Sequence, residues 1–532
     1  MKRSFRLILS VLSGILLSLP WLGYPGWILF FAFIPLLYID KFFVEQKKKY
    51  QSIFFWRYAF LTTLVWNVLA TYWVANITCV GAFVAILVNT FLMSLVLWLA
   101  HWFRRVYKTN LGYLALIIFW ISFEYLHYHW DFEWPWLHTG SQLASNVKMI
   151  QWYEFTGVFG GTFWILLMNI LLFKILIKLK KKNFAEDFLY PLLLFLILLI
   201  VPFLISYFMY TSYEEEDNPK HIVIVQPNID PFTESYSLDA EYEKLYDFIR
   251  LAKSKTDDST DYIVGPETVF ENQWYWDEDK LQSNQFFLLL ADLLTQYSNA
   301  EMIFGVSSFK KYQNKQVATP TARIKGDTIY DRFNTAMFID RDGKEQIYHK
   351  SKLVAGVEKM PFYKYLRLTN DMVFSLGGTS GTLGSQEAPS NFTSKDGTKV
   401  APVICFESAF GEYLTKYVNK GAELFVIITN DGWSKNAPPG YKQHLLLARL
   451  RAIETRRSIA RSANTGISCL INQRGDVLES TKWWTKTSIK GIINANTEVT
   501  FYTKHGDYFA RISSFLSVLL VLTLLVERKL GN

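Results

Sequence analysis

Residues 400–407 read Val-Ala-Pro-Val-Ile-Cys-Phe-Glu, an apolar run that leads directly into a cysteine and a glutamate. A continuous apolar run of this kind is typical of a β-strand that is covered on both faces, as in α/β folds. Cys405, at the end of the run, has two interpretations. Free cysteine is among the most buried residue types, so packing alone can explain it; the alternative is a reactive thiol.

Short runs rich in β-branched residues recur on both sides of this stretch. The other predicted strands are 221–229, 261–264, 302–306, 336–339 and 424–429, and helical patterns separate many of them at about 239–254, 284–297, 411–419 and 441–460. Strands that alternate with helices favour an α/β sandwich. Hairpin-like turns at 340–343 and 472–475 indicate a mixed sheet.

Two further strand ends carry a polar residue. The run Tyr-Ile-Val at 262–264 continues as Gly-Pro-Glu-Thr, so that a proline stops the strand and aims Glu267. The segment 348–354, Tyr-His-Lys-Ser-Lys-Leu-Val, places Lys350 in a loop. Taken alone, a turn glutamate and a loop lysine are most often solvated surface residues. Their order, Glu267, Lys350 and then Cys405, is what makes them candidates.

Outside this region the chain is dominated by long apolar runs. Eight are long enough to span a membrane, at about 6–22, 26–43, 53–74, 81–103, 112–128, 160–179, 189–211 and 510–526. The first follows Lys2, Arg3 and Arg6 but lacks a small-residue cleavage site, so we interpret it as a retained helix rather than a signal peptide. The sequence predicts seven spans in 1–212, a soluble domain in 213–508, and an eighth span with a short tail in 509–532.

Positive charges in alternate loops predict the orientation. They are Lys2, Arg3, Arg6; Lys41, Lys47, Lys48, Lys49; Arg104, Arg105, Lys108; Lys178, Lys180, Lys181, Lys182; and Arg528, Lys529. The positive-inside rule places these loops and both termini in the cytoplasm, and therefore places 213–508 outside. An oxidising compartment favours disulfides, so a Cys405–Cys469 bridge is the structural alternative to a reactive Cys405.

The formal net charge of +8 is explained by these loops. No basic helix with interleaved aromatic residues is present, so we predict no nucleic-acid partner. No HExxH or CxxC spacing occurs, and we predict neither a metal nor a cofactor.

The strand-end residues and the spans together resemble apolipoprotein N-acyltransferases, membrane members of the nitrilase superfamily. The matching pieces are Gly265-Pro266-Glu267-Thr268, Lys350 to Val354 with Glu358, Cys405-Phe406-Glu407, Asn430-Asp431-Gly432-Trp433, Gln443-His444, Ala448-Arg449, Arg451 to Glu454, Asn464-Thr465-Gly466 and, less specifically, Trp134 to Leu137 with Gly157. Departures from the family pattern are Val269, Ala355 and Phe406. They affect loop rigidity or acyl-chain fit, and none removes a reacting group.

The resemblance implies a nitrilase-like αββα sandwich and a Glu267–Lys350–Cys405 triad. It implies that Cys405 takes an acyl chain from the sn-1 position of a phospholipid, with Glu267 as general base. Lys350 and the Phe406 N–H would stabilise the oxyanion of the tetrahedral intermediate. The acceptor would be the diacylglyceryl-modified N-terminal cysteine of an apolipoprotein. Supporting roles fall to Glu358, Glu407 and Trp433. A monomer in a bacterial inner membrane, with a periplasmic catalytic domain, is expected.

Other interpretations of these residues stay open. Glu407 can instead form a strand-end ion pair with Arg449 or Arg451, and Trp433 can be a core residue. Arg449, Arg451, Glu454, Arg457 and Arg461 lie near helical spacing, which predicts an ion-paired helix face.

Two aromatic segments also have alternatives. The segment 273–276 can be an exposed aromatic arm, although packing is the simpler interpretation, and the loop 134–137 can anchor at the membrane surface or line a lipid entry site. For the whole chain, the rivals are a membrane-tethered amidase or nitrilase acting on small C–N substrates and a non-catalytic lipid-binding scaffold.

Overall fold

The computed structural model describes residues 1–178, 188–230, 237–270, 275–362, 382–434 and 438–530. The chain forms two compact units. One comprises Met1–Tyr213 with His505–Asn532, and the other comprises Glu214–Lys504. Each unit is described by itself below.

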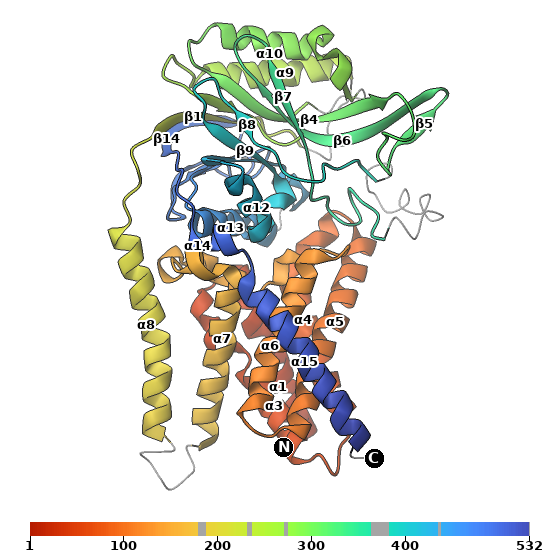
Figure 1. The fold of residues 1–532 in the computed structure, drawn as a ribbon, viewed down its shortest axis with the longest axis vertical. Helices are drawn as coiled ribbons and strands as arrows, with labels where there is room; N and C mark the ends of the chain where they lie inside the picture. The colour runs from red at the N-terminus through yellow and green to blue at the C-terminus, as the bar shows by residue number, and fades with distance from the viewer. Residues whose placement is uncertain (179–187, 231–236, 271–274, 363–381, 435–437, 531–532) are drawn as a thin grey trace. The chain divides into compact units, whose positions relative to one another are not determined.

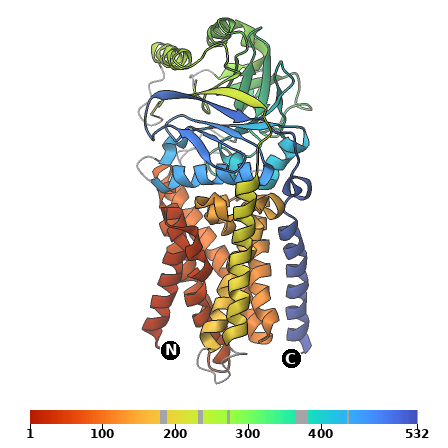
Figure 2. The ribbon, with the colours of Figure 1, turned by 90° about the vertical axis from the view of Figure 1, so that its left-hand side faces the viewer.

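The first unit is a helical bundle. Its helices are α1 (Arg3–Ser18), α2 (Leu29–Ala32), α3 (Ile34–Glu45), α4 (Ile53–Thr71), α5 (Cys79–Val106), α6 (Asn110–His129), α7 (Tyr153–Lys178), α8 (Tyr190–Ser212) and α15 (Tyr508–Leu530). Eight helical segments in the described residues are long and apolar enough to cross a membrane, which confirms the predicted spans. Both termini lie at the same end of this bundle (Figures 1 and 2).

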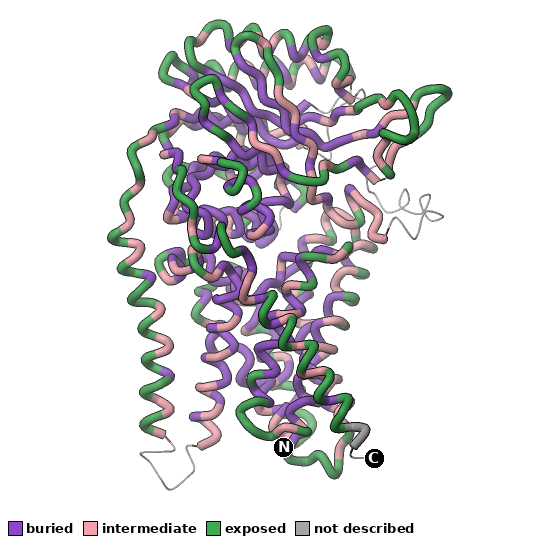
Figure 3. Tube along the Cα trace, in the orientation of Figure 1, coloured by how far each residue is buried: buried purple, intermediate pink, exposed green. Residues whose placement is uncertain are grey.

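Two of these helices expose apolar side chains along most of their length. Only 11% of the most apolar stretch of α8 is buried, and only 17% of that of α15 (Figure 3). Uncovered apolar surface of this extent is unfavourable in water, at roughly 25 cal/mol for each Å². A lipid environment removes that cost, so the burial pattern supports a multi-pass membrane protein.

The second predicted span is broken between α2 and α3. Pro35 lies in the first turn of α3, where its missing N–H costs nothing. At the break, the Phe33 N–H donates to Asn169 Oδ1 at 2.8 Å, and Asn169 Nδ2 donates to the Leu29 carbonyl at 2.6 Å. The backbone groups at the break are thereby satisfied within the bundle, as a membrane interior requires.

The second unit contains two sheets. One has the order β14-β1-β2-β4-β6-β5, with β3 paired to β4 and β7 paired to β6, and the other has the order β13-β12-β11-β10-β9-β8. The strands of the first sheet are β1 (Pro219–Gln226), β2 (Tyr262–Val264), β3 (Trp276–Asp277), β4 (Glu301–Tyr312), β5 (Arg323–Lys325), β6 (Thr328–Ile339), β7 (Glu345–His349) and β14 (Thr487–Asn494). Those of the second are β8 (Phe392–Thr393), β9 (Lys399–Ile404), β10 (Leu424–Thr429), β11 (Ile459–Ala463), β12 (Cys469–Ile471) and β13 (Val477–Ser480).

Helices cover the outer faces of the two sheets. Residues of α9 (Leu238–Lys253) and α10 (Gln285–Thr295) form a hydrophobic core with β1, β2, β4 and β6. The second sheet is covered by α12 (Gly411–Asn419) and α13 (Pro438–Thr455) (Figure 1). The chain leaves this unit through α14 (Phe501–His505). Parallel and antiparallel pairs occur in both sheets, so the predicted mixed α/β sandwich is confirmed.

One helix prediction extends too far. The predicted helix 441–460 ends at Thr455, where Arg456 adopts a positive φ of 49°, and Ile459–Ala463 is the buried strand β11. Arg457 and Arg461 therefore do not belong to a helix face, and that interpretation is wrong for them. The spacing of Arg457 and Arg461 from Glu454 fits a helical repeat of 3.6 residues only by coincidence. β11 is buried on both faces and shows no alternation of polar and apolar residues, so its sequence did not mark it as a strand.

Candidate active site

The three candidate residues follow three different strands. Glu267 lies three residues beyond the end of β2, Lys350 follows β7 directly, and Cys405 follows β9 directly. Lys350 Nζ donates to Glu267 Oε1 at 3.0 Å. The Cys405 thiol faces the Thr429 hydroxyl and lies within electrostatic range of both Glu267 and Lys350. The structure therefore brings together the residues that the sequence singled out.

Lys350 is a buried ammonium held between two carboxylates. Its side chain is 1% exposed, and Nζ donates to Glu358 Oε1 at 2.8 Å as well as to Glu267. Burial alone would lower the pKa of Lys350, but Glu267 and Glu358 hold that pKa well above its ordinary value. Lys350 is thus a fixed positive charge in a site that excludes most water.

Asn334, on β6, belongs to the same group, although the sequence did not single it out. Its Nδ2 donates to Glu267 Oε1 at 2.8 Å and to Glu358 Oε1 at 2.9 Å. The backbone carbonyl of Asn334 accepts from the backbone N–H of Lys350 at 2.9 Å. The amide therefore orients both carboxylates. Asn334 lies outside the predicted strand 336–339, so no sequence pattern marked it.

The Glu267 loop is packed tightly against β4. The Gly305 N–H donates to the Pro266 carbonyl at 2.9 Å, and the Val269 N–H donates to the Gly305 carbonyl at 3.0 Å. A Cβ at Gly305 would lie 2.6 Å from Thr268 N and 2.7 Å from the Glu267 Cα. The glycine is therefore required by close backbone approach. Glu267 Oε2 accepts from the Asn430 N–H at 3.1 Å, which fixes the second oxygen.

Cys405 sits on a strained turn at the end of β9. Its φ is +48°, a region that residues with a Cβ rarely adopt. The residue keeps some exposure, yet burial of the thiol, followed by the charge of Glu267, raises the pKa of Cys405 above its ordinary value despite the opposing effect of Lys350. The group is a neutral thiol at neutral pH, so a reaction at sulfur requires a base.

Glu407 links the lysine loop to the cysteine turn. Oε1 accepts from the Ser351 N–H at 2.7 Å and from the Tyr348 hydroxyl at 2.6 Å, and Oε2 accepts from the Ile404 N–H at 2.8 Å. Burial raises the pKa of Glu407, and these donors oppose that rise.

The predicted ion pair of Glu407 with an arginine is wrong in the described residues. Arg451 pairs with Glu454 at 3.1 Å, and Arg449 Nε donates to the Gly475 carbonyl at 2.7 Å. The backbone donors around Glu407 satisfy the carboxylate in place of a cation.

The remaining candidates differ in exposure. Phe406 is buried, and its ring lies 5.0 Å from that of Phe410. Trp433 is 40% exposed, so its interpretation as a core residue is wrong. All three cysteines are free, which also excludes the Cys405–Cys469 disulfide in this structure.

The aromatic segment 273–276 is only partly within the described residues, because Gln273 and Trp274 lie outside them. Trp276 is 3% exposed and stacks with Phe270 at 6.4 Å, which confirms packing for this residue. Across the described ranges, no group of three or more His, Cys, Asp or Glu residues could hold a metal ion.

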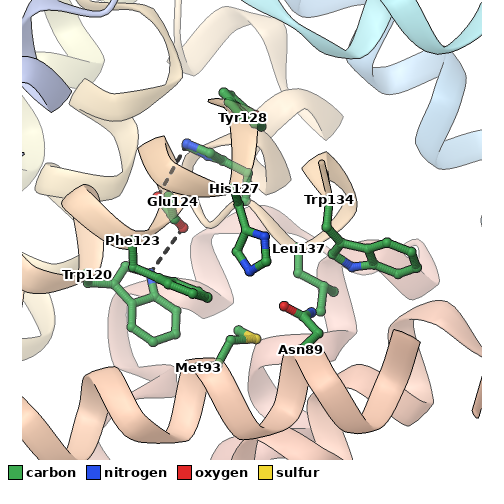
Figure 4. A pocket seen from close by; sticks show the side chains of 10 residues that line it. Asn89, Met93, Trp120, Phe123, Glu124, His127, Tyr128, Trp134 and Leu137 are labelled. Carbon is green, nitrogen blue, oxygen red and sulfur yellow. Dashed lines mark hydrogen bonds and ion pairs between the residues drawn. The ribbon is translucent and has the colours of Figure 1, made fainter. Parts of the chain in front are cut away.

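The first unit contains a small cavity beside the loop 134–137. Trp134 and Leu137 line it together with Asn89, His127 and Glu124 (Figure 4). The Glu124 carboxylate accepts from Trp120 Nε1 at 3.0 Å and from the Thr139 N–H at 2.7 Å. With a volume of about 10 Å³, the cavity has room for roughly one water molecule and none for an acyl chain. Its polar contacts hold the loop against α6.

Comparisons with known proteins extend over nearly the whole chain. The family model described as "Carbon-nitrogen hydrolase" matches residues 222–500, and that described as "Apolipoprotein N-acyltransferase N-terminal domain" matches residues 13–171. A protein of Chlorobaculum tepidum named apolipoprotein N-acyltransferase is 27% identical over 543 residues, which cover 98% of this chain and 97% of the relative. One of Geobacter metallireducens with the same name is 28% identical, over 94% of this chain and 92% of the relative.

Two solved structures are also similar. A Saccharomyces cerevisiae member of branch 10 of the nitrilase superfamily has 15% identity and a TM-score of 0.37, over 53% of this chain and 93% of its own. An amidase from Nesterenkonia sp. has 13% identity and a TM-score of 0.37, over 57% of this chain and 98% of its own.

Proposed function

Because the chain belongs to the carbon-nitrogen hydrolase family, in the branch formed by membrane-bound apolipoprotein N-acyltransferases, we propose that it moves an acyl chain from a phospholipid to a lipoprotein amine through a thioester on Cys405. The observation that carries the proposal is a neutral thiol on a strained strand end, beside a carboxylate and a buried ammonium, in a chain whose described residues include eight apolar helices long enough to span a membrane.

The first half-reaction forms the thioester. Glu267 takes the thiol proton as the sulfur of Cys405 attacks the sn-1 ester carbonyl of the phospholipid. Lys350 and the Phe406 N–H stabilise the oxyanion of the tetrahedral intermediate. When the ester C–O bond breaks, Glu267 returns its proton to the leaving oxygen. The products are a lysophospholipid and an acyl group on sulfur.

The second half-reaction consumes the thioester. The acceptor is the α-amino group of a lipoprotein N-terminal cysteine that already carries diacylglycerol. Glu267 takes a proton from the attacking amine, the same donors stabilise the oxyanion, and the C–S bond breaks as the sulfur regains its proton. The new bond is an amide. No group beyond these side chains is needed to balance protons.

Three polar residues keep the reacting groups in place. Glu358, 2.8 Å from Lys350 Nζ, and Asn334 hold the ammonium and the Glu267 carboxylate in one geometry. Glu407 couples the backbone of the lysine loop to that of the cysteine turn. Trp433, exposed on the turn that follows β10, provides an apolar surface for an acyl chain.

The membrane is part of the proposed mechanism. A buried CH₂ group is worth about 0.8 kcal/mol, so transferring a chain of about fifteen such groups into water would cost about 12 kcal/mol. The substrates must therefore react while their chains remain in an apolar environment. Eight spans with positive charges in the loops on the side of the termini support a catalytic domain on the periplasmic side of the inner membrane.

Thioester formation is directly testable. The purified protein in detergent is incubated with a phospholipid labelled in its sn-1 chain, denatured, and treated with neutral hydroxylamine. We expect covalent label on the wild type that hydroxylamine releases, and none on Cys405→Ala. Label that survives hydroxylamine, or that persists in Cys405→Ala, would overturn the proposal. Turnover of a small water-soluble amide without lipid would favour the rival amidase.

A further inference from the structure

A buried polar chain leads to the back of the cysteine turn. Arg461, on β11, donates from Nη2 to Asp431 Oδ2 at 2.8 Å, and Asp431 Oδ1 lies 2.9 Å from His444 Nδ1. Burial would raise the pKa of Asp431, but Arg461 and His444 lower it to about 2. The ionised carboxylate therefore anchors one nitrogen of the His444 ring, which lies on α13.

The other nitrogen of this ring faces the backbone of Cys405. His444 Nε2 lies 3.1 Å from the Cys405 carbonyl oxygen and 2.9 Å from Ser408 Oγ. Ser408 Oγ donates its single proton to the same carbonyl at 2.7 Å. With the Ser408 proton directed at that carbonyl, both oxygens beside Nε2 offer lone pairs, so Nε2 is placed to donate a hydrogen bond to the Cys405 carbonyl. The Cys405 carbonyl thus accepts from two side chains that are themselves buried.

The position of this carbonyl determines where the next N–H points. The Cys405 carbonyl and the Phe406 N–H belong to one peptide group, which is planar and trans, so the two bonds point in opposite directions. The turn is strained, with a Cys405 φ of +48°, and does not hold this orientation by backbone preference alone. Fixing the carbonyl oxygen on one side therefore fixes the N–H on the other.

We propose that His444 is a positioning residue for the oxyanion site: with Ser408 it holds the Cys405 carbonyl and thereby aims the Phe406 N–H at the developing oxyanion. Asp431 and Arg461 hold the ring. The inference rests on the proposed function, because the Phe406 N–H acts only if an acyl group is attacked by Cys405. In this view, the direction of the Phe406 N–H is set by two side chains away from the reacting atoms, Ser408 on η11 (Cys405–Ala409) and His444 on α13.

The expected effect is specific to steps that form an oxyanion. Loss of one oxyanion donor commonly costs about 10²- to 10³-fold in kcat, and misorientation costs less. We expect His444→Phe to slow thioester formation on Cys405 by about 10- to 100-fold with little change in KM for phospholipid. Alkylation of Cys405 by iodoacetamide displaces iodide and forms no oxyanion, so its rate should stay within about twofold of the wild type.

The test compares these two rates in the full-length protein in detergent. His444→Gln retains an N–H donor at about the reach of Nε2 and should recover most of the acylation rate. Ser408→Ala should give a defect of the same kind, and its combination with His444→Phe should be less than additive, because both act on one carbonyl. The control is His221→Gln, a histidine-to-glutamine change on β1 outside the Cys405 turn, which should change neither rate.

The outcomes separate the inference from the proposed function. A wild type that forms no hydroxylamine-labile acyl group would overturn the proposed function itself. With an active wild type, the inference is overturned if His444→Phe acylates at the wild-type rate, or if acylation and alkylation fall in the same proportion, as general disruption of the turn would cause. If His444→Phe does not fold, Ser408→Ala is judged by the same two criteria.

Discussion

The charge of each group at the site decides its role. Cys405 is kept as a thiol because burial and the Glu267 carboxylate raise its pKa more than Lys350 lowers it. Lys350 stays an ammonium because two carboxylates contact it. The resting site therefore holds its reactive sulfur in the unreactive protonation state, next to the group proposed to remove the proton. The thiolate needs to exist only during attack on an acyl carbonyl.

Replacing the proposed base should separate two kinds of reactivity. In Glu267→Gln the carboxylate charge that raises the Cys405 pKa is gone, so that pKa falls and more thiolate exists at a given pH. We expect the pH profile of iodoacetamide alkylation to move to lower pH. Thioester formation should nevertheless fall by about 10²- to 10⁴-fold, because no general base remains.

The matched control for this change is Glu301→Gln. Glu301 is a buried carboxylate on β4 that accepts from the Lys395 N–H at 2.9 Å, so its loss should leave both measurements unchanged. An alkylation profile that moves to higher pH in Glu267→Gln, or an unchanged acylation rate, would contradict the assignment of Glu267.

The sequence predicted some residues of the site and missed others for a physical reason. Glu267, Lys350 and Cys405 were found because each follows a strand, and a resemblance to a family joined them. Asn334 contacts carboxylates that are distant in sequence, Asp431 was noted only within a family-matching segment and without a role, and Arg461 belongs to a strand that was mistaken for helix. Such contacts depend on which strands become neighbours within each sheet, which no local pattern describes.

At the level of elements, the strand order determines how the site is assembled. β2 and β4 are parallel neighbours, so the loop after β2 runs along the middle of β4. The continuous apolar runs predicted six of the fourteen strands in the described residues, namely β1, β2, β4, β6, β9 and β10. The strand β14 pairs antiparallel with β1 at the edge of the first sheet, and it was not predicted. Its residues are only partly buried, so it lacks a continuous apolar run, and it does not follow a predicted helix as many of the other strands do.

The close approach at β4 makes Gly305 a sensitive position. In Gly305→Ala the new methyl group would meet the backbone of Glu267 and Thr268, and neither can move without displacing the Glu267 carboxylate. A misplacement of about 1 Å can cost about 10²-fold in rate, so we expect thioester formation to fall by at least about tenfold in protein that remains folded. The measurement is the labelling assay together with thermal unfolding.

Gly491→Ala is the control for this substitution. Gly491 also lies inside a strand, but a methyl group there would meet the end of the flexible Leu470 side chain at 2.5 Å. That side chain can rotate away, so we expect a small loss of stability and an unchanged acylation rate. Equal rates for the two variants would contradict the view that β4 sets the position of Glu267.

At the level of the whole molecule, the proposed chemistry depends on which side of the membrane receives residues 214–504. If all eight candidate spans in the described residues cross the membrane, both termini are expected on one side of it. Seven of these spans precede residues 214–504, so the second unit is expected on the opposite side. The loop between α3 and α4 carries Lys47, Lys48 and Lys49 and is expected in the cytoplasm, whereas the exposed Cys79 at the start of α5 is expected outside.

This arrangement predicts opposite labelling of two cysteines in intact cells. With Cys405→Ser as background, a membrane-impermeant maleimide should label Cys79, and Cys79→Ser should abolish the signal. Adding Lys48→Cys to the Cys79→Ser, Cys405→Ser variant should give label only after the inner membrane is opened.

Reporter fusions test the same orientation. A fluorescent protein fused to the C-terminus should fluoresce, and an alkaline phosphatase fused after Tyr213 should be active, since the first reporter works in the cytoplasm and the second works outside it. Labelling of residue 48 in intact cells would place the thiol of Cys405 in the cytoplasm, where the proposed transfer to exported lipoproteins could not occur.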